Sequence, residues 1–376
     1  MGIPDKRTII VVENCLGYTG AFKAILQVVE NLSDQYRFVF VLTQGSSVGE
    51  ILRQKGIFVY HLPFFPLQRK IKSIILYIPK LISNSLRLRA IVKKEKAVVI
   101  HANDIYNLSP LLVKLSLPGI KLVTHIRILQ NSFPKVIYKT WVGLAELCSD
   151  VIIGVSKASL QPFSPSKRLT LIHDGISRDE AYNYSYEPEP LNYNLLYLAN
   201  YIQGKGHELA IETFALVLKE KPNARLTFVG DTFGLPNNEL YKKVLIDKAR
   251  DLKIESSVIF KSFTNDIEKE FKESHVFLNL SEAESFSFTC LEALYYGVPC
   301  IATASGGPQE ILDNGTYGIL IYERNKHKVA NEILKLLNNP DQRLLFSNRG
   351  RLYVRKVFSP QSTSYKVNAI YSRLIS

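Results

Sequence analysis

Short apolar runs rich in β-branched residues alternate with segments of helical spacing through the first half of the chain. These runs predict strands at residues 8–12, 36–42, 57–61, 97–101, 121–125 and 151–155. Between the first two runs, residues 21–32 carry apolar side chains at the three- and four-residue intervals of a helix. Strands that alternate with helices in this way are typical of a parallel sheet that is covered on both faces.

This rhythm stops at residues 177–193, which contain Glu187-Pro-Glu-Pro190 and have no apolar period, and we interpret them as a linker. It then restarts, with a predicted helix at 207–220 and predicted strands at 194–198, 225–230, 258–260, 276–280 and 300–302. The expected domains are therefore two α/β units at residues 1–176 and 194–356. Ser359-Pro360 is a typical helix start, so residues 357–376 should form a last helix that packs back on the first domain.

Length and composition agree with two folded domains. A chain of 376 residues is long enough for two cores, and 46% hydrophobic with 22% charged residues excludes global disorder. The four cysteines are widely spaced and have neither metal-ligand nor CxxC spacing, so we expect ordinary buried thiols. We find no signal-peptide pattern and no apolar stretch long enough to span a bilayer, and we therefore expect a cytoplasmic protein.

The positive charge of the chain is concentrated in one region. The formal net charge is +13, and residues 60–139 hold 14 lysines and arginines but only two acids, Glu95 and Asp104. Such a region can bind an anionic membrane surface, a polyphosphate or a nucleic acid, or it can simply be a solvated face that aids solubility. Residues 64–96 mix aromatic, aliphatic and cationic side chains, a composition that can lie on anionic lipid at the inner face of a membrane.

The segment Glu284-Ser-Phe-Ser-Phe-Thr-Cys-Leu-Glu292 directly follows a predicted strand and opens a predicted helix. Ser285 or Ser287 can cap that helix, and the amides from Ser287 to Thr289 would then form a phosphate site at its start. The two glutamates on either side can accept hydrogen bonds from neutral hydroxyls. A sugar nucleotide has hydroxyls at both ends and negative charge in the middle, so this segment can be a binding site for one. The alternative interpretation is an ordinary capped helix with two glutamates on the protein surface.

Three glycine-rich turns follow predicted strands. In Gln203-Gly-Lys-Gly-His207, Lys205 lies between two glycines and can place a cation on phosphate oxygens. Ser305-Gly-Gly-Pro-Gln-Glu310 permits close backbone approach. Asn14-Cys-Leu-Gly-Tyr-Thr-Gly20 lacks the G-x-G-x-x-G spacing of a nicotinamide site. Each of these, taken alone, is also compatible with a plain turn.

Two histidines, His101 and His125, each stand at the carboxyl end of a predicted strand. We expect both of them to face the cleft between the domains, which is the natural active site of two doubly wound sheets. With Asp104 as the single nearby carboxylate, they do not form a metal site.

Together these motifs resemble the retaining glycosyltransferases of family 4, which have the GT-B fold of two Rossmann-like doubly wound domains facing a central cleft. The resemblance covers nearly the whole chain and is strongest from residue 194 to residue 320. The matching elements occur in the order of that family: the loop with Gly17 and Gly20, Val123-Thr-His125, Asp150 to Ser156, Asp174-Gly-Ile176, Lys205-Gly-His207, Val229-Gly-Asp231, Glu284-x7-Glu292, Gly297-Val-Pro299 and Gly306-Gly-Pro-x-Glu310.

The resemblance implies that residues 1–176 form the Rossmann-like acceptor-binding domain and residues 194–356 the Rossmann-like nucleotide-sugar-binding domain. It also implies roles for individual residues. The implied catalytic residues are His125, Glu284 and Lys205. In that family pattern Lys205 holds the donor diphosphate, Glu284 binds hydroxyls of the donor sugar and His125 lies beside the transferred sugar. Glu292 binds the ribose, the Gly20 amide meets a phosphate, and backbone groups near Phe260 and Ser262 meet the base. The full substrate-binding set is Gly17, Gly20, Asn200, Gly204, Phe260, Ser262, Phe286, Ser287, Phe288, Thr289 and Glu292.

Three positions depart from the pattern of the family. Asn200 stands where the family usually has an arginine, so one phosphate-binding cation is missing. Ser287 stands where the family has glycine, and Asn103 replaces the second histidine of a common His-x-His. These departures bear mainly on the identity of the donor.

The implied activity is retaining, metal-independent transfer of a hexose-type unit from a nucleotide diphosphate sugar, without a cofactor. The expected acceptor is a glycan or lipid-linked glycan in bacterial surface polysaccharide synthesis. A nucleotide-sugar 2-epimerase of the same fold is an alternative, which needs no acceptor. A basic nucleic-acid-binding protein is the alternative from another class, although we find no helix-turn-helix or RNA-binding signature and expect no nucleic acid partner.

Overall fold

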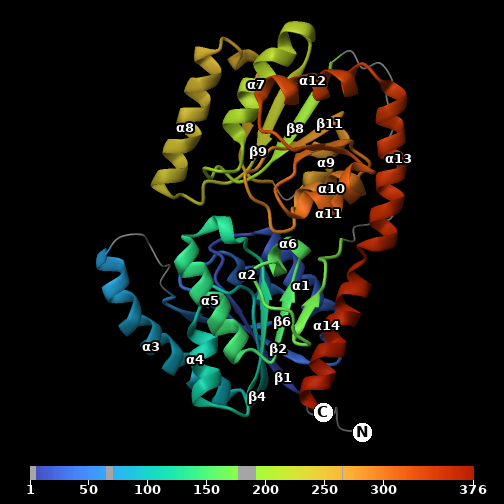
Figure 1. Cartoon of the computed structure of the whole chain (residues 1–376). Coiled ribbons are helices and arrows are strands. Elements are labelled where there is room, and N and C mark those ends of the chain that lie inside the picture. Colours follow the sequence, from blue (N-terminus) through green and yellow to red (C-terminus); the bar gives the residue numbers. More distant parts are fainter. Residues whose placement is uncertain (1–5, 65–70, 177–191, 265) are drawn as a thin grey trace. The chain divides into compact units, whose positions relative to one another are not determined.

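The computed structural model describes residues 6–64, 71–176, 192–264 and 266–376. The chain forms two compact units: unit 1 contains the residues up to Gly175 together with Pro360–Ser376, and unit 2 contains Ile176–Ser359 (Figure 1). Residues 177–191 of the expected linker lie outside the described residues. Each unit is built on its own parallel sheet.

The sheet of unit 1 has seven strands in the order β3-β2-β1-β4-β5-β6-β7, and all its pairs are parallel. The strands are β1 (Thr8–Glu13), β2 (Arg37–Thr43), β3 (Phe58–Leu62), β4 (Ala97–Ala102), β5 (Lys121–Ile126), β6 (Val151–Gly154) and β7 (Leu169–Leu171). The six predicted strands are confirmed to within one residue at either end. The seventh, β7, was not predicted because three half-buried residues at a sheet edge carry too little apolar pattern.

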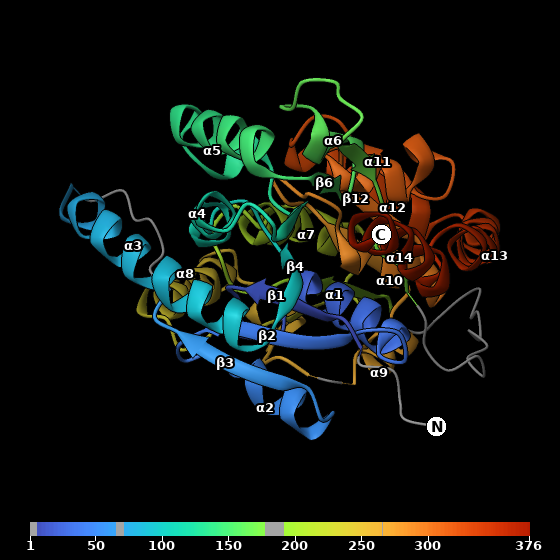
Figure 2. The same ribbon diagram turned by 90° about the horizontal axis from the view of Figure 1, so that it is seen from below.

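Helices cover both faces of this sheet (Figure 2). Ile9 and Val11 of β1 pack in one core with the first, second and last helices, whereas Ile10 and Val12 pack on the opposite face with the third and fourth. This double coverage explains why the strands are apolar at consecutive positions. The helices of unit 1 are α1 (Gly20–Leu32), α2 (Val48–Gln54), α3 (Ile71–Lys94), α4 (Ser109–Ser116), η1 (Gln130–Ser132), α5 (Lys135–Cys148), α6 (Lys157–Leu160) and α14 (Pro360–Ile375).

The last helix, α14, completes unit 1. It begins at Pro360, where the sequence predicts a helix start, and it lies against α1. Asn31 Nδ2 donates to Ser364 Oγ at 3.0 Å, and the Tyr36 hydroxyl donates to Asn368 Oδ1 at 2.8 Å. Tyr371 is fully buried in the same core, so the end of the chain is an integral part of the first sheet's packing.

The sheet of unit 2 has six parallel strands in the order β10-β9-β8-β11-β12-β13. The five predicted strands are again confirmed to within one residue, and β13 is the short edge strand that the sequence pattern missed. The strands are β8 (Asn194–Leu198), β9 (Arg225–Val229), β10 (Val258–Lys261), β11 (Val276–Asn279), β12 (Cys300–Thr303) and β13 (Ile319–Ile321).

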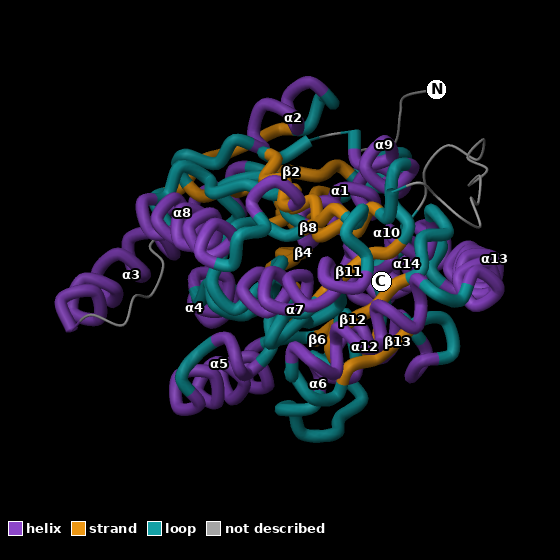
Figure 3. Tube along the Cα trace, turned by 90° about the horizontal axis from the view of Figure 1, so that it is seen from above, coloured by secondary structure: helices purple, strands orange, loops and turns teal. Residues whose placement is uncertain are grey.

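The helices of unit 2 also lie on both faces of its sheet (Figure 3). Phe214 and Ile333 belong to the core on one face, and Phe271 packs against Phe277 and stacks on Tyr296 away from that core. The helices are α7 (His207–Glu220), α8 (Pro236–Asp251), η2 (Glu255–Ser257), α9 (Ile267–Lys272), α10 (Phe288–Tyr295), α11 (Gly307–Ile311), η3 (Asp313–Gly315), α12 (Lys326–Leu337) and α13 (Pro340–Val357).

The strand order of each sheet fixes where a ligand can bind. In unit 1 the order reverses between β1 and β4, and in unit 2 it reverses between β8 and β11. At such a switch point the loops that follow the two strands diverge to opposite faces and leave a crevice at the carboxyl edge. The glycine turns and the Glu284–Glu292 segment follow these strands or their neighbours.

Within the described residues, no helix is both long enough and apolar enough to cross a bilayer. All four cysteines are buried and unpaired, which confirms the expectation of ordinary buried thiols.

Candidate active site

The loop between β8 and α7 holds Lys205 at the switch point of unit 2. Its flanking glycines, Gly204 and Gly206, have φ angles of +89° and +81°. A Cβ at Gly206 would come within 2.1 Å of the Leu280 carbonyl oxygen, so only glycine permits this approach of the loop to the end of β11. The Tyr197 hydroxyl donates to the Lys205 carbonyl and accepts from the Leu280 amide, which fixes the loop between the two strands.

Lys205 and Glu284 form an ion pair. The Lys205 Nζ lies 2.8 Å from Glu284 Oε1, and the Ser281 hydroxyl donates to the same oxygen at 2.8 Å. The Lys205 side chain is 34% exposed and that of Glu284 is 14% exposed. An ammonium has three N–H donors, so this pairing leaves Lys205 able to bind a further acceptor.

The helix that follows Glu284 is not capped in the way the sequence suggests. Helix α10 begins at Phe288 with Ser287 at its N-cap, but the Ser287 side chain makes no capping hydrogen bond, so the predicted Ser285 or Ser287 cap is wrong. The Ser287 hydroxyl instead accepts from Asn279 Nδ2 at 2.8 Å, and Ser287 has φ = +73°. This is a conformation that glycine adopts without strain.

The N-terminus of α10 lies beside the ion pair. The start of a helix carries the positive end of the helix dipole, which favours an anion, and the Cys290 amide of this first turn donates to the Ser287 carbonyl at 3.1 Å. Phe288 is buried, Thr289 is partly exposed at the first turn, and Phe286 is buried just before it. Glu292 is only 5% exposed, which excludes the alternative of a surface acid at this position.

The turn with Gly306 and Gly307 packs directly against the Glu284 segment. The Glu284 amide donates to the Ser305 carbonyl at 3.0 Å, and the Gly307 amide donates to the Glu284 carbonyl at 2.7 Å. A Cβ at Gly307 would lie 2.2 Å from the Phe286 Cα. Three motifs that are separate in the sequence therefore meet at the carboxyl edge of β8, β11 and β12.

The residues expected near the base lie along the same edge, on the other side of β8. Phe260 near the end of β10 stacks on Phe228, with ring centroids 5.3 Å apart. Ser262, the first residue after β10, is exposed. Asn200 Oδ1 accepts from the Asp231 amide at 3.1 Å, so this side chain ties the loop after β8 to the loop after β9. The expected donor-binding residues of unit 2 thus form one row along the sheet edge.

Arg324 is a cation near this row that the sequence reasoning missed. It follows β13, pairs with Glu282 at 2.8 Å and donates to the Leu280 carbonyl at 3.3 Å. The Glu282 amide in turn donates to the Gly204 carbonyl at 2.9 Å. No motif in the sequence marks Arg324, because its position depends on where the edge strand β13 ends.

In unit 1, Gly20 is the first residue of α1 and is exposed, whereas Gly17 is buried in the preceding turn. Thr19 caps this helix, its hydroxyl accepting from the Phe22 amide at 3.2 Å. The buried carboxylate of Glu13 at the end of β1 accepts from the Cys15 amide at 2.9 Å. It also accepts from Asn103 Nδ2. Burial raises the pKa of Glu13, and hydrogen bonds from Asn103 and Cys15 oppose this rise.

Arg127 organises the neighbouring strand ends and was also missed from the sequence. Its NH1 donates to both carboxylate oxygens of Asp174, at 2.8 and 3.1 Å, and its Nε donates to Asn103 Oδ1. Its NH2 lies 3.4 Å from His125 Nδ1. Asn103, which replaces a histidine of the resembled family, therefore links Glu13 to Arg127.

The two strand-end histidines do not have equivalent positions. His101 and His125 are both buried, and His101 Nδ1 lies 2.6 Å from the Tyr371 hydroxyl of α14. Its Nε2 lies 3.3 Å from His125 Nδ1. Burial, with Arg127 as a further cause, lowers the pKa of His101 to about 3 and that of His125 well below its ordinary value.

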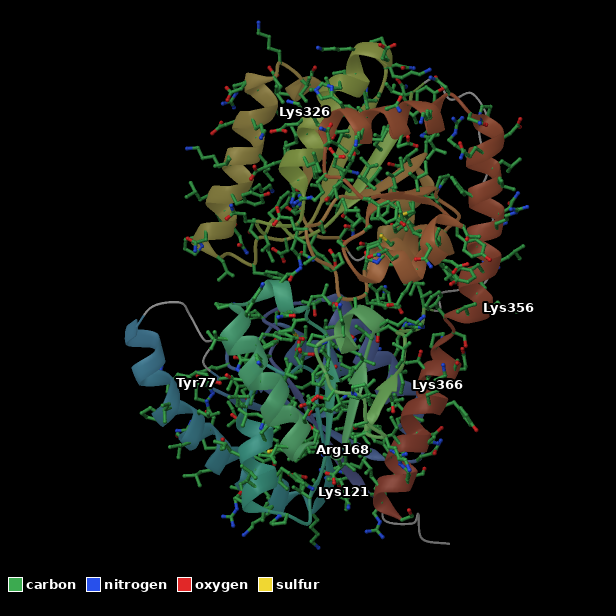
Figure 4. The ribbon with its side chains drawn as sticks, in the orientation of Figure 1. Tyr77, Lys121, Arg168, Lys326, Lys356 and Lys366 are labelled. Carbon is green, nitrogen blue, oxygen red and sulfur yellow. The ribbon has the colours of Figure 1, made fainter. Side chains whose placement is uncertain are left out.

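A cavity of about 210 Å³ opens in unit 1 beside the loop that carries Gly17. Tyr77 of α3 contributes to its wall (Figure 4). All of its lining residues are uncharged, although they lie in the most basic region of the chain. Five are aromatic and five carry neutral amides or hydroxyls; the full lining is Asn14, Leu16, Thr43, Phe64, Tyr77, Leu81, Asn84, Tyr106, Asn107, Ser109, Phe133 and Trp141.

No group of three or more His, Cys, Asp and Glu side chains that could hold a metal ion occurs in the part of the chain that the structure describes.

Comparison with known proteins finds a family similarity over most of unit 2. Residues 187–353 match the model of the family described as glycosyl transferases group 1. Over 177 residues the chain is 28% identical to N-acetyl-alpha-D-glucosaminyl L-malate synthase of Bacillus anthracis, a match that covers 47% of this chain and 44% of the synthase. Over 316 residues it is 25% identical to an alpha-1,3/1,6-mannosyltransferase of Dictyostelium discoideum, covering 70% of this chain and 74% of that enzyme. The chain thus spans less than half the length of the first of these relatives.

Solved structures extend the likeness to the whole fold. Anabaena HepE in complex with UDP-glucose superposes with a TM-score of 0.82 at 18% identity, covering 97% of this chain and 99% of HepE. A glycosyltransferase of Rickettsia africae gives a TM-score of 0.76 at 18% identity, with 99% of each chain covered. The chain therefore has the GT-B fold of two parallel-sheet units, and residues 187–353 are similar to the glycosyl transferases group 1 family.

Proposed function

We propose that this protein is a glycosyltransferase that moves a sugar from a nucleotide diphosphate sugar to an acceptor. The observation that carries the proposal is the Lys205–Glu284 pair beside the start of α10 in unit 2. It combines a cation, a carboxylate and a helix N-terminus, which suit a diphosphate joined to a sugar with free hydroxyls. The similarity to HepE, which is described with UDP-glucose, supports a donor of this class.

Each part of the donor has a proposed partner in the row of residues along the sheet edge. The ammonium of Lys205 and the first amides of α10 bind the diphosphate, and Glu284 accepts from sugar hydroxyls through its second oxygen. The ribose hydroxyls bind the carboxylate of Glu292. The base lies at the other end of the row, near Phe260 and Ser262. Asn200 is uncharged and so supplies no cation to the diphosphate. Its Oδ1 accepts from the Asp231 amide, so this side chain shapes the loop between the two ends of the row.

We propose that transfer retains the anomeric configuration and needs no metal. The acceptor then attacks from the face that the phosphate leaves, and the departing phosphate takes the acceptor proton. The task of the protein is to stabilise the negative charge that develops on the leaving group, a task for Lys205 and the amides of α10. Glu284 is engaged by Lys205 and Ser281, which argues against its use as a nucleophile. We assign the Gly20 amide to a phosphate and His125 to the transferred sugar.

For the acceptor, we propose that the uncharged cavity of unit 1 holds a neutral glycosyl unit. Aromatic rings such as Trp141 and Tyr106 offer flat apolar surface for a sugar face, and the neutral amides of Asn14 and Asn107 offer hydrogen bonds. The absence of charge among the described lining residues favours a neutral ring over a phosphate. This supports a glycan or lipid-linked glycan acceptor of the kind used in polysaccharide synthesis.

A lipid-linked acceptor further implies contact with a membrane surface. Helix α3 exposes three large apolar side chains four residues apart, Ile78, Ile82 and Leu86, at 59%, 51% and 60%. Residues with this spacing lie on one face of a helix. The same helix carries Lys80, Arg87, Arg89, Lys93 and Lys94. We propose that this face rests on anionic lipid, with its apolar side chains inserted among the headgroups.

The test begins with a thermal-shift screen of UDP-, GDP-, ADP- and CMP-sugars, because a donor that binds the native state raises its melting temperature. Transfer is then measured for Lys205→Ala and Glu284→Ala, with Lys335→Ala at an exposed pair of α12 as the matched control. We expect loss of transfer in the first two variants and not in the control. Wild-type rates in all three would contradict the assignment. Product analysis with donor alone separates transfer from 2-epimerisation, which needs no acceptor.

A further inference from the structure

Three buried rings in unit 1 form a row of hydrogen-bonding atoms. The Tyr371 hydroxyl lies 2.6 Å from His101 Nδ1, and His101 Nε2 lies 3.3 Å from His125 Nδ1. His101 and His125 stand on the adjacent strands β4 and β5, whereas Tyr371 comes from α14, 270 residues after His101. At the end of the row, His125 Nε2 is buried without a hydrogen-bond partner among the described residues.

Arg127 decides which nitrogen of His125 carries the proton. Its NH2 group lies 3.4 Å from His125 Nδ1, and a guanidinium can only donate hydrogen bonds. Nδ1 must therefore accept and carry no proton. Burial and the neighbouring Arg127 charge hold the pKa of His125 well below its ordinary value, so the ring is neutral. A neutral imidazole has one N–H, which leaves the proton of His125 on Nε2.

The same reasoning fixes the other two rings. Because His125 Nδ1 is an acceptor, His101 Nε2 must donate to it. His101 is also neutral, since burial lowers its pKa to about 3, and its Nδ1 is then an acceptor. The Tyr371 hydroxyl therefore donates to His101 Nδ1, and burial raises the pKa of Tyr371, which keeps that proton in place. One proton arrangement satisfies every contact in the row.

We infer that Tyr371 and His101 form a relay that, together with Arg127, holds His125 as a hydrogen-bond donor, with its Nε2–H directed at an oxygen atom of the bound substrate. In this state the Nε2–H of His125 donates a hydrogen bond to the substrate oxygen, and Nε2 cannot act as a base that removes a proton. The identity of the acceptor oxygen rests on the proposed function, in which it is a hydroxyl of the transferred sugar. Tyr371 and His101 are positioning residues that act through His125.

The chain offers a matched control for Tyr371. The Tyr36 hydroxyl also bonds across the interface between α1 and α14, to Asn368 Oδ1 at 2.8 Å, and its ring packs edge-on against Tyr371 at 5.6 Å. Tyr36→Phe therefore removes a hydroxyl from the same packing environment but leaves the relay complete. A purely structural role of Tyr371 would make Tyr36→Phe and Tyr371→Phe equivalent.

The direct test is ¹⁵N NMR of the histidine-labelled full chain at neutral pH. We expect His125 to show an unprotonated Nδ1 and a protonated Nε2 in the wild type and in Tyr36→Phe. In Tyr371→Phe, His101 Nδ1 loses its hydrogen-bond donor, so its ¹⁵N resonance should shift, whereas Tyr36→Phe should leave that resonance unchanged. A proton on Nδ1 of His125, or a charged His125 ring, would overturn the relay whatever the activity of the protein.

Transfer kinetics test the role of the fixed donor. Tyr371→Phe should lower kcat by about fivefold, the value of one hydrogen bond, whereas Tyr36→Phe should not. The amide nitrogen of glutamine reaches farther along the side chain than that of asparagine and lies nearer the position of Nε2. We therefore expect His125→Gln to retain more activity than His125→Asn. Equal activity of the two tyrosine variants, or an Asn variant at least as active as the Gln variant, would contradict the assignment. Complete lack of transfer by the wild type would contradict the proposed function and leave the NMR result standing.

Discussion

Lys205 Nζ lies 2.8 Å from Glu284 Oε1, so a residue proposed for the donor phosphate and one proposed for the donor sugar are bonded to each other. The pair places positive and negative charge side by side at the start of α10. The carboxylate is positioned by Ser281 and the lysine by two glycines in left-handed conformations. Donor recognition therefore depends on one coupled unit, not on two independent side chains.

Removing either member of this pair should affect catalysis much more than stability. We expect Lys205→Ala to lower kcat/KM by on the order of 10²- to 10³-fold, the usual effect of losing one group that stabilises transition-state charge. Its free energy of unfolding should change by less than about 1 kcal/mol, because a partly exposed ion pair contributes little. Steady-state kinetics and urea unfolding check the two parts. Equal losses of activity in Lys205→Ala and the surface variant Lys335→Ala would contradict this role.

Replacing Ser287 by glycine should be better tolerated than replacing it by alanine. At φ = +73° a glycine relieves backbone strain, whereas alanine keeps the strain, and both substitutions equally remove the hydroxyl that accepts from Asn279. We expect Ser287→Gly to be more stable than Ser287→Ala by about 1 kcal/mol. Urea unfolding followed by circular dichroism measures the difference. The reverse order would show that the φ value carries no cost at this position.

A methyl group at Gly307 should disturb the site. The added Cβ would lie 2.2 Å from the Phe286 Cα and from the Phe286 carbonyl oxygen, and both are backbone atoms that cannot rotate away. We expect Gly307→Ala to cost about 2–3 kcal/mol and to weaken donor binding, since Glu284 pairs with this turn. Gly143→Ala on the exposed side of α5, where a Cβ meets nothing within 4 Å, is the control and should not destabilise. Thermal melts with and without donor check both variants.

The contribution of Asp104 to the stability of unit 1 should fall as the pH rises through its titration. Burial raises the pKa of Asp104 to about 7, with the Glu13 charge as a further cause, while hydrogen bonds from the Ile105 and Arg127 amides oppose the rise. At this group the native state binds more protons than the unfolded state between about pH 4 and pH 7, so the contribution of Asp104 to stability falls with rising pH in this window. The lowered pKa values of His101 and His125 give contributions of the opposite sign below about pH 6.5, so the difference between variant and wild type isolates the effect of Asp104.

The variant Asp104→Asn should reduce this pH dependence and unfold later than the wild type at pH 8. Fluorescence of Trp141, the single tryptophan of the chain, reports unfolding of unit 1. Asp34→Asn, at an exposed position, serves as the comparison. An unchanged slope in Asp104→Asn would assign the titration to another group.

Polar substitution of the apolar face of α3 should abolish binding to membranes. We expect the triple variant Ile78→Ser, Ile82→Ser, Leu86→Ser to stay in solution when the wild type floats with vesicles that contain anionic lipid at low salt. Val136→Ser and Leu147→Ser remove exposed apolar side chains of α5 and should leave flotation unchanged. Flotation of the triple variant at the wild-type level would contradict the proposed surface.

The strands were predictable because parallel strands buried on both faces are apolar at consecutive positions, as Ile9 to Val12 illustrate. The two short edge strands, β7 and β13, were not predictable because each has only three residues. The glycine turns were recognisable by composition, and the structure shows why Gly206 and Gly307 are required there. The predicted side-chain cap at Ser285 or Ser287 was wrong because the Ser287 hydroxyl accepts from Asn279 Nδ2 of the preceding strand and does not bond to the first amides of α10.

The sequence by itself determined the two sheets, the helices between their strands, and the kinds of residue that stand at the strand ends. Local periodicity and turn chemistry suffice for these features, since they depend on residues a few positions apart. Only the tertiary structure decided which of the strand-end side chains meet. Lys205 pairs with Glu284 across 79 residues, and Tyr371 reaches His101 across 270. Such contacts follow from strand order and from the packing of a distant helix, and neither leaves a local pattern in the chain.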